Sequence, residues 1–308
     1  MAVYKPEGSL ISTPSNIAAL KSPAALQEAF SQGKILEARA MSCDCDHNLI
    51  LDLGCMKGII PRAEAALGIE EGDVRDIAII SRVNKPTCFK ILCFAKEPNG
   101  TPYAILSRRA VQEECRREYT RKLVPGDIIP VCITRLEPFG CFVDIACGII
   151  SMIPIDFISV SRISHPSDRF YNGQSIYAVV KSIDDDSGKI TLSHKELLGT
   201  WQQNAQSFHI GETVSGIVRS IENYGVFVEL TPNLAGLAEP KEGVYVGQLA
   251  SVYIKNLIPE KMKIKLIIID AFDAPCAQKE PNYFIESSHI DSFVYSPQEC
   301  SKLIETVF

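Results

Sequence analysis

The chain has 308 residues, of which 46% are hydrophobic and 22% charged, so it can bury substantial cores and is not expected to be disordered. No apolar run approaches the length of about 18 residues that a membrane helix requires, and the first residues lack the apolar region of a signal peptide. Eleven cysteines without a repeated spacing favour reduced thiols over a disulfide framework. We therefore expect a cytoplasmic protein of two or three domains that does not associate with a membrane.

The net charge of −6 is unevenly distributed along the chain. Residues 271–308 contain six acids against only Lys279 and Lys302, which leaves the rest of the chain near neutral. This distribution excludes a broad basic field. If the partner is a nucleic acid, we expect binding by base stacking and a few local charges, with a shallow salt dependence.

Helix signals lie before, between and after the β-rich parts of the chain. The sequence from Ser22-Pro23 to Gln32-Gly33 has an N-cap, a proline at the first helical position and a glycine stop. Val111–Leu123 and Thr200–Phe208 are predicted to be helical linkers. Ser296-Pro297-Gln298-Glu299 has capping-box spacing and predicts a last helix.

An internal repeat organises the region between these helices. Pro138–Ile145 aligns with Asn223–Leu230, so that an aromatic-Gly-x-Phe-Val-acid-aliphatic pattern occurs twice. His47–Leu53 is a third and weaker copy. Each copy follows a strand that begins at a glycine, and these glycines are Gly33, Gly126 and Gly211.

Each repeat also contains a hairpin signal between two alternating segments, at Ala95–Ala104, Val179–Leu192 and Val252–Leu266. About five short strands in some 60–80 residues are typical of a small closed barrel of the oligonucleotide-binding (OB) kind. The predicted fold is therefore mainly β, with three tandem five-stranded OB-type barrels, helical linkers and short terminal helices. The expected parts are a helical cap (1–32), a degenerate barrel (33–117), a barrel with the intact motif (118–198), a shortened barrel (199–270) and an acidic extension (271–308).

Strand alternation predicts which side of the barrel the aromatic residues face. Cys141, Val143 and Ile145 share the apolar inner face, which places Phe142 outside with Asp144. Phe139 lies at the bend before the strand and can reach the same outer face. The third repeat places Phe227 and Glu229 outside in the same way, after Tyr224.

Two exposed rings on a barrel surface form a stacking platform for unpaired bases, worth roughly 1–3 kcal/mol per base. The alternative is that these rings are ordinary core residues or pack against the linker helices. The first repeat has His47 and Ile50 at the same two positions. We expect that barrel to fold normally and to bind poorly.

Charged residues near the motif are further candidates. Arg162, His165 and Arg169 lie in the long connection of the second repeat, where they could contact phosphate or could simply form a turn. Lys263 lies between Lys261 and Lys265 on one face of a strand, where the three lysines could follow a phosphate backbone or protect a sheet edge.

Catalytic signatures are absent from the sequence. It contains no Gly-x-x-x-x-Gly-Lys phosphate loop, no His-Glu-x-x-His and no Gly-x-Ser-x-Gly. Cys43, Cys45 and His47 alternate along a predicted strand, but structural zinc sites favour a Cys-x₂₋₄-Cys spacing. We therefore expect no enzyme activity, no catalytic residue, no metal, no cofactor and no small-molecule substrate.

The motif Phe139-Gly140-x-Phe142-Val143-Asp144, followed by Gly173-Gln174 and by Ser182 through Lys195, resembles the S1 RNA-binding domain. The continuation from Leu197 through Trp201 to Tyr224-Gly225-x-Phe227 is similar to the junction between successive S1 repeats. The resemblance covers about residues 33–270 and is strongest over 126–230.

This resemblance implies an OB-fold barrel that binds single-stranded RNA on its aromatic face. Carried over by position, the stacking pair is Phe139 and Phe142, and the acid and base near the last hairpin of that repeat are Asp184 and Lys189. The matching residues of the third repeat are Tyr224, Phe227 and Lys263. The histidine that is usual in the family is replaced by Pro154 and Glu239, and the third repeat has a shortened connection. We rank the second barrel as the best binder, the third as partial and the first as structural.

The expected function is non-enzymatic binding of single-stranded RNA, with mRNA as the natural form, linked to translation at the small ribosomal subunit. The alternative is a protein-interaction or RNA-turnover accessory module that uses degenerate S1 barrels.

Overall fold

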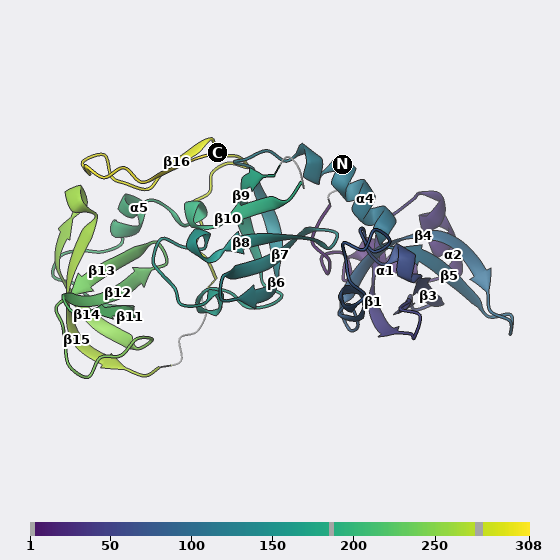
Figure 1. The fold of residues 1–308 in the computed structure, drawn as a ribbon, viewed down its shortest axis with the longest axis horizontal. Helices are drawn as coiled ribbons and strands as arrows, with labels where there is room; N and C mark the ends of the chain where they lie inside the picture. Colours follow the sequence, from purple (N-terminus) through teal and green to yellow (C-terminus); the bar gives the residue numbers. More distant parts are fainter. Residues whose placement is uncertain (1–3, 185–187, 275–279) are drawn as a thin grey trace. The chain divides into compact units, whose positions relative to one another are not determined.

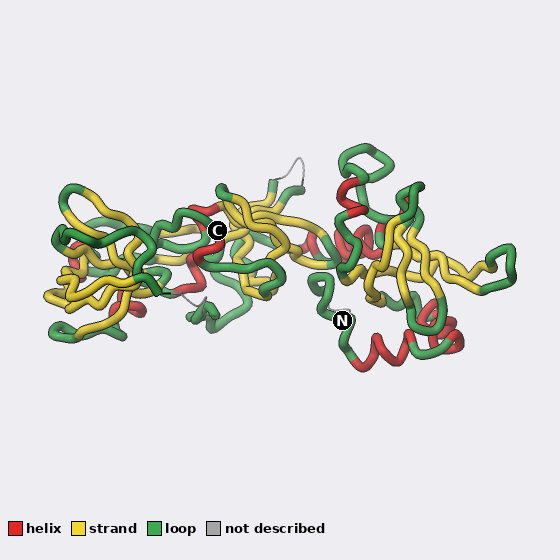
Figure 2. Tube along the Cα trace, turned by 90° about the horizontal axis from the view of Figure 1, so that it is seen from below, coloured by secondary structure: helices red, strands yellow, loops and turns green. Residues whose placement is uncertain are grey.

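The structure is a computed structural model that describes residues 4–184, 188–274 and 280–308. It contains three closed five-stranded barrels in chain order (Figures 1 and 2), which confirms the predicted mainly β fold. The chain divides into two compact units. The first comprises Met1–Leu123 with Asp144–Ile150, and the second comprises Val124–Val143 with Ser151–Phe308.

All three barrels have the same strand topology. In each, the first strand pairs with the second and the fourth, the fourth also pairs with the fifth, and the third pairs with the fifth in parallel. This parallel pairing closes the sheet into a barrel, as the OB-type prediction requires. The strands of the first barrel are β1 Leu36–Cys43, β2 Leu49–Asp52, β3 Lys57–Ile60, β4 Pro86–Lys96 and β5 Pro102–Ser107.

The third barrel and most of the second lie in the second unit, whereas residues 144–150 of the second barrel belong to the first unit. The second barrel consists of β6 Ile128–Glu137, β7 Gly140–Ala146, β8 Ile149–Pro154, β9 Ser175–Ile183 and β10 Ile190–Ser193. The third consists of β11 Thr213–Glu222, β12 Gly225–Thr231, β13 Leu234–Ala238, β14 Leu249–Ile258 and β15 Lys263–Phe272. The turn predicted around Asp186-Ser187-Gly188 lies partly outside the described residues.

Glycine after the first aromatic residue of the motif permits close packing of two strands. A Cβ atom at Gly140 would lie 2.4 Å from the carbonyl oxygen of Ile153, and one at Gly225 would lie 2.5 Å from that of Ala238. Any larger residue would push the second and third strands of the barrel apart. The repeated glycine is therefore a requirement of barrel geometry.

The helices are short, and two of them lie where their capping residues predict them. The Ser22 side chain accepts a hydrogen bond from the backbone of Ala25, and Thr200 and Gln203 form a capping box. Within the described residues, no helix is long and apolar enough to cross a membrane. The α-helices are α1 Pro14–Leu20, α2 Pro23–Ser31, α3 Ile77–Ile80, α4 Arg109–Glu118 and α5 Trp201–Ala205. The 3₁₀ turns are η1 Arg62–Glu64, η2 Thr120–Lys122, η3 Ile155–Phe157, η4 Pro166–Asp168, η5 Lys195–Leu198 and η6 Pro259–Lys261.

The prediction of a last helix at Ser296 is wrong. The chain there forms a two-stranded sheet of β16 Ser292–Val294 and β17 Glu305–Val307. The Ser296 hydroxyl donates to the carbonyl of Lys302 and accepts from the N–H of Ile304, so it joins two segments of a hairpin. The Ser296 hydroxyl makes both of its hydrogen bonds across the hairpin, so it does not cap a helix.

A buried carboxylate holds the N-terminal segment in the first unit. Glu7 is 3% exposed and lies 2.8 Å from guanidinium nitrogens of both Arg108 and Arg82. It also accepts a hydrogen bond from the N–H of Cys88. The two positive charges outweigh the cost of burial and lower the pKa of Glu7 to about 2. One side chain therefore joins three segments that are distant in sequence.

Replacing Glu7 by glutamine should lower the unfolding free energy of the first unit by about 3–5 kcal/mol, because it leaves two guanidinium groups without their buried counter-charge. Differential scanning calorimetry of the full chain would measure the change. Glu71→Gln, at an exposed position of the same unit, is the matched control and should leave the transition unchanged. Equal transitions in the two variants would contradict this account of Glu7.

Candidate nucleic-acid interface

The second barrel carries an outward-facing pair of aromatic rings at the start of β7. Phe142 is partly exposed, whereas its neighbours Cys141 and Val143 are fully buried, as strand alternation predicts. Phe139 is 55% exposed. The ring centroids of Phe139 and Phe142 lie 6.0 Å apart with an interplanar angle of 87°. The two rings thus form an edge-to-face pair that presents one broad face to solvent.

The third barrel repeats this arrangement at the start of β12. Tyr224 is 67% exposed, and its ring centroid lies 6.1 Å from that of Phe227 at an interplanar angle of 90°. Val226 and Val228 on either side of Phe227 are buried. The ring pair therefore has the same geometry in both barrels, although the first ring is a phenylalanine in one and a tyrosine in the other.

The outer faces that carry the second aromatic residues also carry paired side chains of the neighbouring strands. In the third barrel, Phe227 pairs with Leu237, and Leu237 pairs with Lys265. In the second barrel, Met152 of β8 pairs with Thr191 of β10. The row of the third barrel thus extends its aromatic surface over three adjacent strands.

The predicted basic residues lie where the last strand of each of these barrels begins. Lys263 precedes the row residue Lys265 of β15 by two positions, so it shares the outer face of that strand, and Lys189 lies directly before β10. Both are exposed. Asp184 donates its backbone N–H to the carbonyl of Lys189 at 2.9 Å, which places the predicted acid at the same hairpin end.

The first barrel has an aliphatic row in place of an aromatic one. Ile50 pairs with Ile59, and Ile59 pairs with Ile105. His47 lies in a turn with a positive φ of 62°, outside the strand. The first barrel therefore lacks the ring pair that the other two barrels share.

The expected alternation of Cys43, Cys45 and His47 along one strand is wrong. β1 ends at Cys43, and the Asp44 carboxylate then accepts hydrogen bonds from the backbone of Asp46 and Asn48 to form a turn. Among the residues that the structure describes, no group of three or more His, Cys, Asp and Glu side chains is placed to hold a metal ion.

The long connection of the second barrel contains the remaining predicted residues. Arg162 is exposed. His165 accepts a hydrogen bond from the N–H of Ser167 at its Nδ1 atom and caps η4, which is the local turn arrangement. Arg169 is buried against Glu229 of the third barrel.

Glu229 is the centre of a charge cluster between the second and third barrels. It is 5% exposed and binds both Arg169 and Arg219, the latter at 2.9 Å. Arg219 also reaches Asp168 at 3.3 Å. Strand alternation correctly places Glu229 on the outer face of its barrel, but the second barrel covers it there. Arg169 consequently belongs to this cluster and not to the open aromatic face.

Backbone contacts surround the same cluster. The N–H of Ser161 donates to the carbonyl of Pro232 at 3.1 Å, and that of Val160 donates to the Asn233 side chain at 3.0 Å. Arg219 and Asn233 were not among the residues that the sequence singled out. The sequence signal for this cluster was Glu229, the acid two positions after the second ring. Its arginine partners cannot be identified from the sequence, because they meet it only when the barrels pack.

The C-terminal segment packs along the second barrel and the linker helix α5. Ile128 donates its N–H to the carbonyl of Ser288, and Trp201 donates to that of Tyr295. His289 contacts Asp127 at 2.8 Å. These contacts lie at the start of β6 and at the start of α5, and Phe139, just before β7, remains largely exposed.

A buried histidine connects this segment to the second barrel. His194 Nδ1 lies 3.0 Å from the carbonyl of Ile158, so Nδ1 carries the proton and Nε2 accepts from the Tyr283 hydroxyl at 3.2 Å. The Tyr283 hydroxyl in turn accepts from the N–H of Tyr177. Burial, together with the nearby positive charge of Arg169, lowers the pKa of His194 to about 4.

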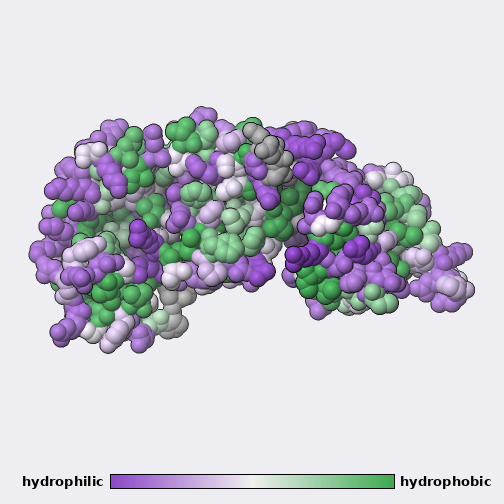
Figure 3. Space-filling view, in the orientation of Figure 1, coloured by the Kyte–Doolittle hydropathy of each residue, from purple (hydrophilic) through white to green (hydrophobic). Residues whose placement is uncertain are grey.

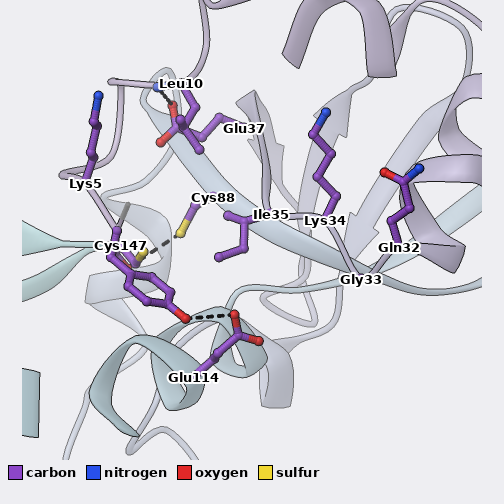
Figure 4. Close-up of a pocket in the computed structure, with 11 residues that line it drawn as sticks. Lys5, Leu10, Gln32, Gly33, Lys34, Ile35, Glu37, Cys88, Glu114 and Cys147 are labelled. Atoms are coloured by element: carbon purple, nitrogen blue, oxygen red, sulfur yellow. Dashed lines mark hydrogen bonds between the residues drawn. The ribbon is translucent and has the colours of Figure 1, made fainter. Parts of the chain in front are cut away.

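A pocket of about 420 Å³ lies in the first unit, beside the N-terminal segment (Figure 4). Its polar groups already bond to the protein: Tyr4 donates to Glu114 at 3.0 Å, and Glu37 accepts from the N–H of Leu10 at 2.9 Å. Burial raises the pKa of Glu37 to about 7. The buried thiols of Cys88 and Cys147 lie at the same wall. These contacts explain how the segment is held and identify no ligand.

A protein-family comparison matches residues 122–195, the second barrel, to the S1 RNA binding domain. The resemblance to the S1 family is confirmed. The matched range contains the ring pair Phe139 and Phe142 and the hairpin that ends at Lys189. The match of the second barrel to an RNA-binding domain family supports nucleic-acid binding.

Curated relatives align with a larger part of the chain. The small ribosomal subunit protein bS1 homolog of Bacillus cereus is 31% identical over 255 residues, which cover 81% of this chain and 62% of the relative. The small ribosomal subunit protein bS1 of Staphylococcus aureus is 29% identical over 264 residues, covering 80% and 64%. The chain thus spans less than two thirds of the length of either relative.

A solved structure of a multidomain protein with nucleic acid binding domains from Streptococcus pneumoniae also aligns. It covers 77% of this chain and 74% of its own length, with 10% identity and a TM-score of 0.25.

Acid should destabilise the second unit through His194. Its folded pKa of about 4 lies below the unfolded value of about 6.5, so the unfolded state takes up the proton first and stability falls as pH drops from 6.5 towards 4. Linkage at this one site gives a loss of about 2 kcal/mol at pH 5. Chemical denaturation at pH 7.5 and pH 5 would measure it.

The matched variant is His194→Gln, which keeps a donor and an acceptor but does not titrate. The difference in unfolding free energy between pH 7.5 and pH 5 should be smaller in this variant by about 2 kcal/mol. The same pH dependence in variant and wild type would show that His194 is not the group responsible.

Proposed function

We propose that this chain binds single-stranded RNA, without catalysis, through the outer aromatic faces of its second and third S1-type barrels. The observation that carries the proposal is the edge-to-face pair of exposed rings, which recurs at the same strand positions in two barrels. Stacking of an unpaired base on such a pair contributes roughly 1–3 kcal/mol and requires no particular base. Binding is therefore of low sequence specificity.

The binding residues fall into two groups with different roles. Phe139, Phe142, Tyr224 and Phe227 stack on bases. Lys189 and Lys263, where the last strand of each barrel begins, contact phosphate, and Asp184 lies beside Lys189 at the hairpin end. Arg162 and His165 belong to the connection beside the second barrel, where Arg162 is exposed.

The second barrel binds more strongly than the third under this proposal. Both carry the ring pair, but the third has a shortened connection between β13 and β14. We propose residues 33–117, 118–198 and 199–270 as the limits of the three barrels. The first of these has no ring pair and does not stack bases.

The relatives supply the biological setting of the proposal. Those named small ribosomal subunit protein bS1 align with about four fifths of this chain. We infer that the RNA is mRNA and that the chain acts in the cytoplasm, in translation at the small ribosomal subunit. An RNA-turnover accessory would use the same aromatic faces.

A second candidate function is protein docking by the first barrel. The row of Ile50, Ile59 and Ile105 gives that barrel an aliphatic outer face where the other barrels have rings. Aliphatic surface without stacking partners favours contact with protein side chains over bases. Protein docking by the first barrel does not depend on RNA binding by the other two barrels.

Replacing both rings of the second barrel by alanine (Phe139→Ala with Phe142→Ala) should weaken RNA binding by about 10-fold or more, because at least one stacked base is lost. Fluorescence anisotropy with a labelled unstructured RNA of about a dozen nucleotides, a length suited to one or two OB surfaces, would measure the affinity. The equivalent pair Tyr224→Ala with Phe227→Ala should cause a smaller loss.

The matched control is Tyr171→Ala with Tyr245→Ala, which removes two exposed aromatic rings that lie outside the outer rows. It should bind RNA like the wild type. If the phenylalanine variant binds RNA as tightly as this control, the aromatic face is not the binding site. If the folded wild type fails to bind at tens of micromolar, protein docking becomes the leading candidate.

A further inference from the structure

The end of helix α4 and the turn η2 that follows it form the most basic stretch of the first unit. Val111, Gln112 and Cys115 form the buried side of α4, so the helical period places Glu113, Arg116 and Arg117 together on the outer side. The 3₁₀ turn η2 then brings Arg121 to the same surface. In Figure 3 the surface over α4 is strongly hydrophilic.

These side chains line a shallow hollow of about 260 Å³. Leu67 provides its apolar part, and the N–H of Leu67 donates to the Gln112 side chain at 2.9 Å, which holds that loop against α4. Arg116, Arg117 and Arg121 contribute three guanidinium groups, and Glu113 contributes the one carboxylate. The lining therefore has a formal excess of two positive charges.

Most acids near the hollow are already paired with other bases. Glu113 bonds to Arg109 at 3.1 Å, and Glu118 bonds to both Arg117 and Lys122. Among the ion pairs of the described residues, none includes Arg116 or Arg121. Two guanidinium groups thus converge on one hollow without a carboxylate partner.

Interaction with the helix dipole accounts for only part of this arrangement. Arg116 and Arg117 lie in the last turn of α4, where positive charge is favourable. Arg121 lies beyond the helix and gains nothing from its dipole, yet it lines the same hollow. An anion that bridges the guanidinium groups would relieve their mutual repulsion, and the planar donor fork of arginine matches phosphate geometry.

We propose that this hollow, formed by Arg116, Arg117 and Arg121, binds a phosphate group of an RNA backbone. It is too small and too open to enclose a nucleotide, since pockets for small molecules span roughly 300–1,000 Å³ and bury most of their ligand. A phosphate within a polymer needs no enclosure, because the rest of the chain is held elsewhere. The choice of RNA as the polymer rests on the proposed function, whereas the phosphate site itself rests on the arginine geometry.

The inference is tested with Arg116→Gln combined with Arg121→Gln in the full chain. Each phosphate contact to a single strand contributes about 0.7 to the slope of log affinity against log salt. Losing this one phosphate contact should lower that slope by about 0.7, so the advantage of wild type over the variant should shrink about 2.6-fold between 50 and 200 mM salt. Anisotropy with the labelled RNA measures both quantities.

Arg75→Gln with Lys96→Gln is the matched control, because it removes two exposed charges from the same unit outside the hollow. It should retain the wild-type slope. A slope in the arginine variant equal to that of this control would overturn the proposal. Calorimetry of each variant confirms that the first unit remains folded.

A second probe, a linear inorganic polyphosphate, separates this site from the aromatic faces, because it has phosphates but no bases. Its affinity, measured by isothermal titration calorimetry, should fall in the arginine variant and remain unchanged in the Phe139→Ala and Phe142→Ala variant. If the wild type does not bind RNA but still binds polyphosphate in an arginine-dependent way, the proposed function is contradicted and the phosphate site is not. Polyphosphate binding that is absent in wild type, or equal in the arginine variant and its control, would overturn the phosphate site alone. A free nucleotide that binds as tightly as the polymer would overturn the choice of a polymer.

Discussion

The parallel pairing of the third and fifth strands determines how each barrel presents its outer face. It closes the sheet and places one residue from each of three neighbouring strands in a single row, such as Phe227, Leu237 and Lys265. Closure also requires the second and third strands to approach closely, which glycine at positions 140 and 225 permits. The ring pair therefore follows from the same geometry that closes the barrel. Sequence variation in these rows changes what the barrel can bind without changing its fold.

The acid that follows the ring pair has a structural use in this chain. Glu229 is buried between two arginines where the connection of the second barrel meets the third. Asp144, at the same position of the second barrel, accepts hydrogen bonds from the N–H groups of Glu7 and Gly148, and burial raises its pKa to about 7. Both carboxylates are thus removed from solvent. Their removal lessens the negative charge beside the rings, which favours the approach of a polyanion.

Much of the fold could be predicted because it depends on local patterns. Alternation, hairpin residues and the repeated motif identify the barrels, and the caps at Ser22 and Thr200 identify two helices. Ser296 shows where local patterns fail. Its capping-box spacing is genuine, but its hydroxyl finds partners across a hairpin that packs on another part of the chain. Helix α1 was missed because its capping threonine lies in a segment that is held by long-range contacts to Glu37.

The candidate site divides in the same way. The orientation of Phe142 and Phe227 follows from strand period alone, so the sequence predicts it. The positions of Arg169 and Arg219 depend on how the second and third barrels pack, and burial at such a contact has no local signature. The arginines around Leu67 are a similar case, since residues some 50 positions apart form one hollow only after the chain folds.

The C-terminal segment has a consequence for how the second barrel can be isolated. The family match ends at residue 195, but the barrel edge at Gly126 and Ile128 is hydrogen-bonded to Ile290 and Ser288, and His194 depends on Tyr283 for its acceptor bond. A fragment cut at the limits of the family match would expose those backbone groups as an unpaired edge, which invites aggregation. The smallest piece that keeps this barrel intact therefore extends to the end of the chain and includes the third barrel.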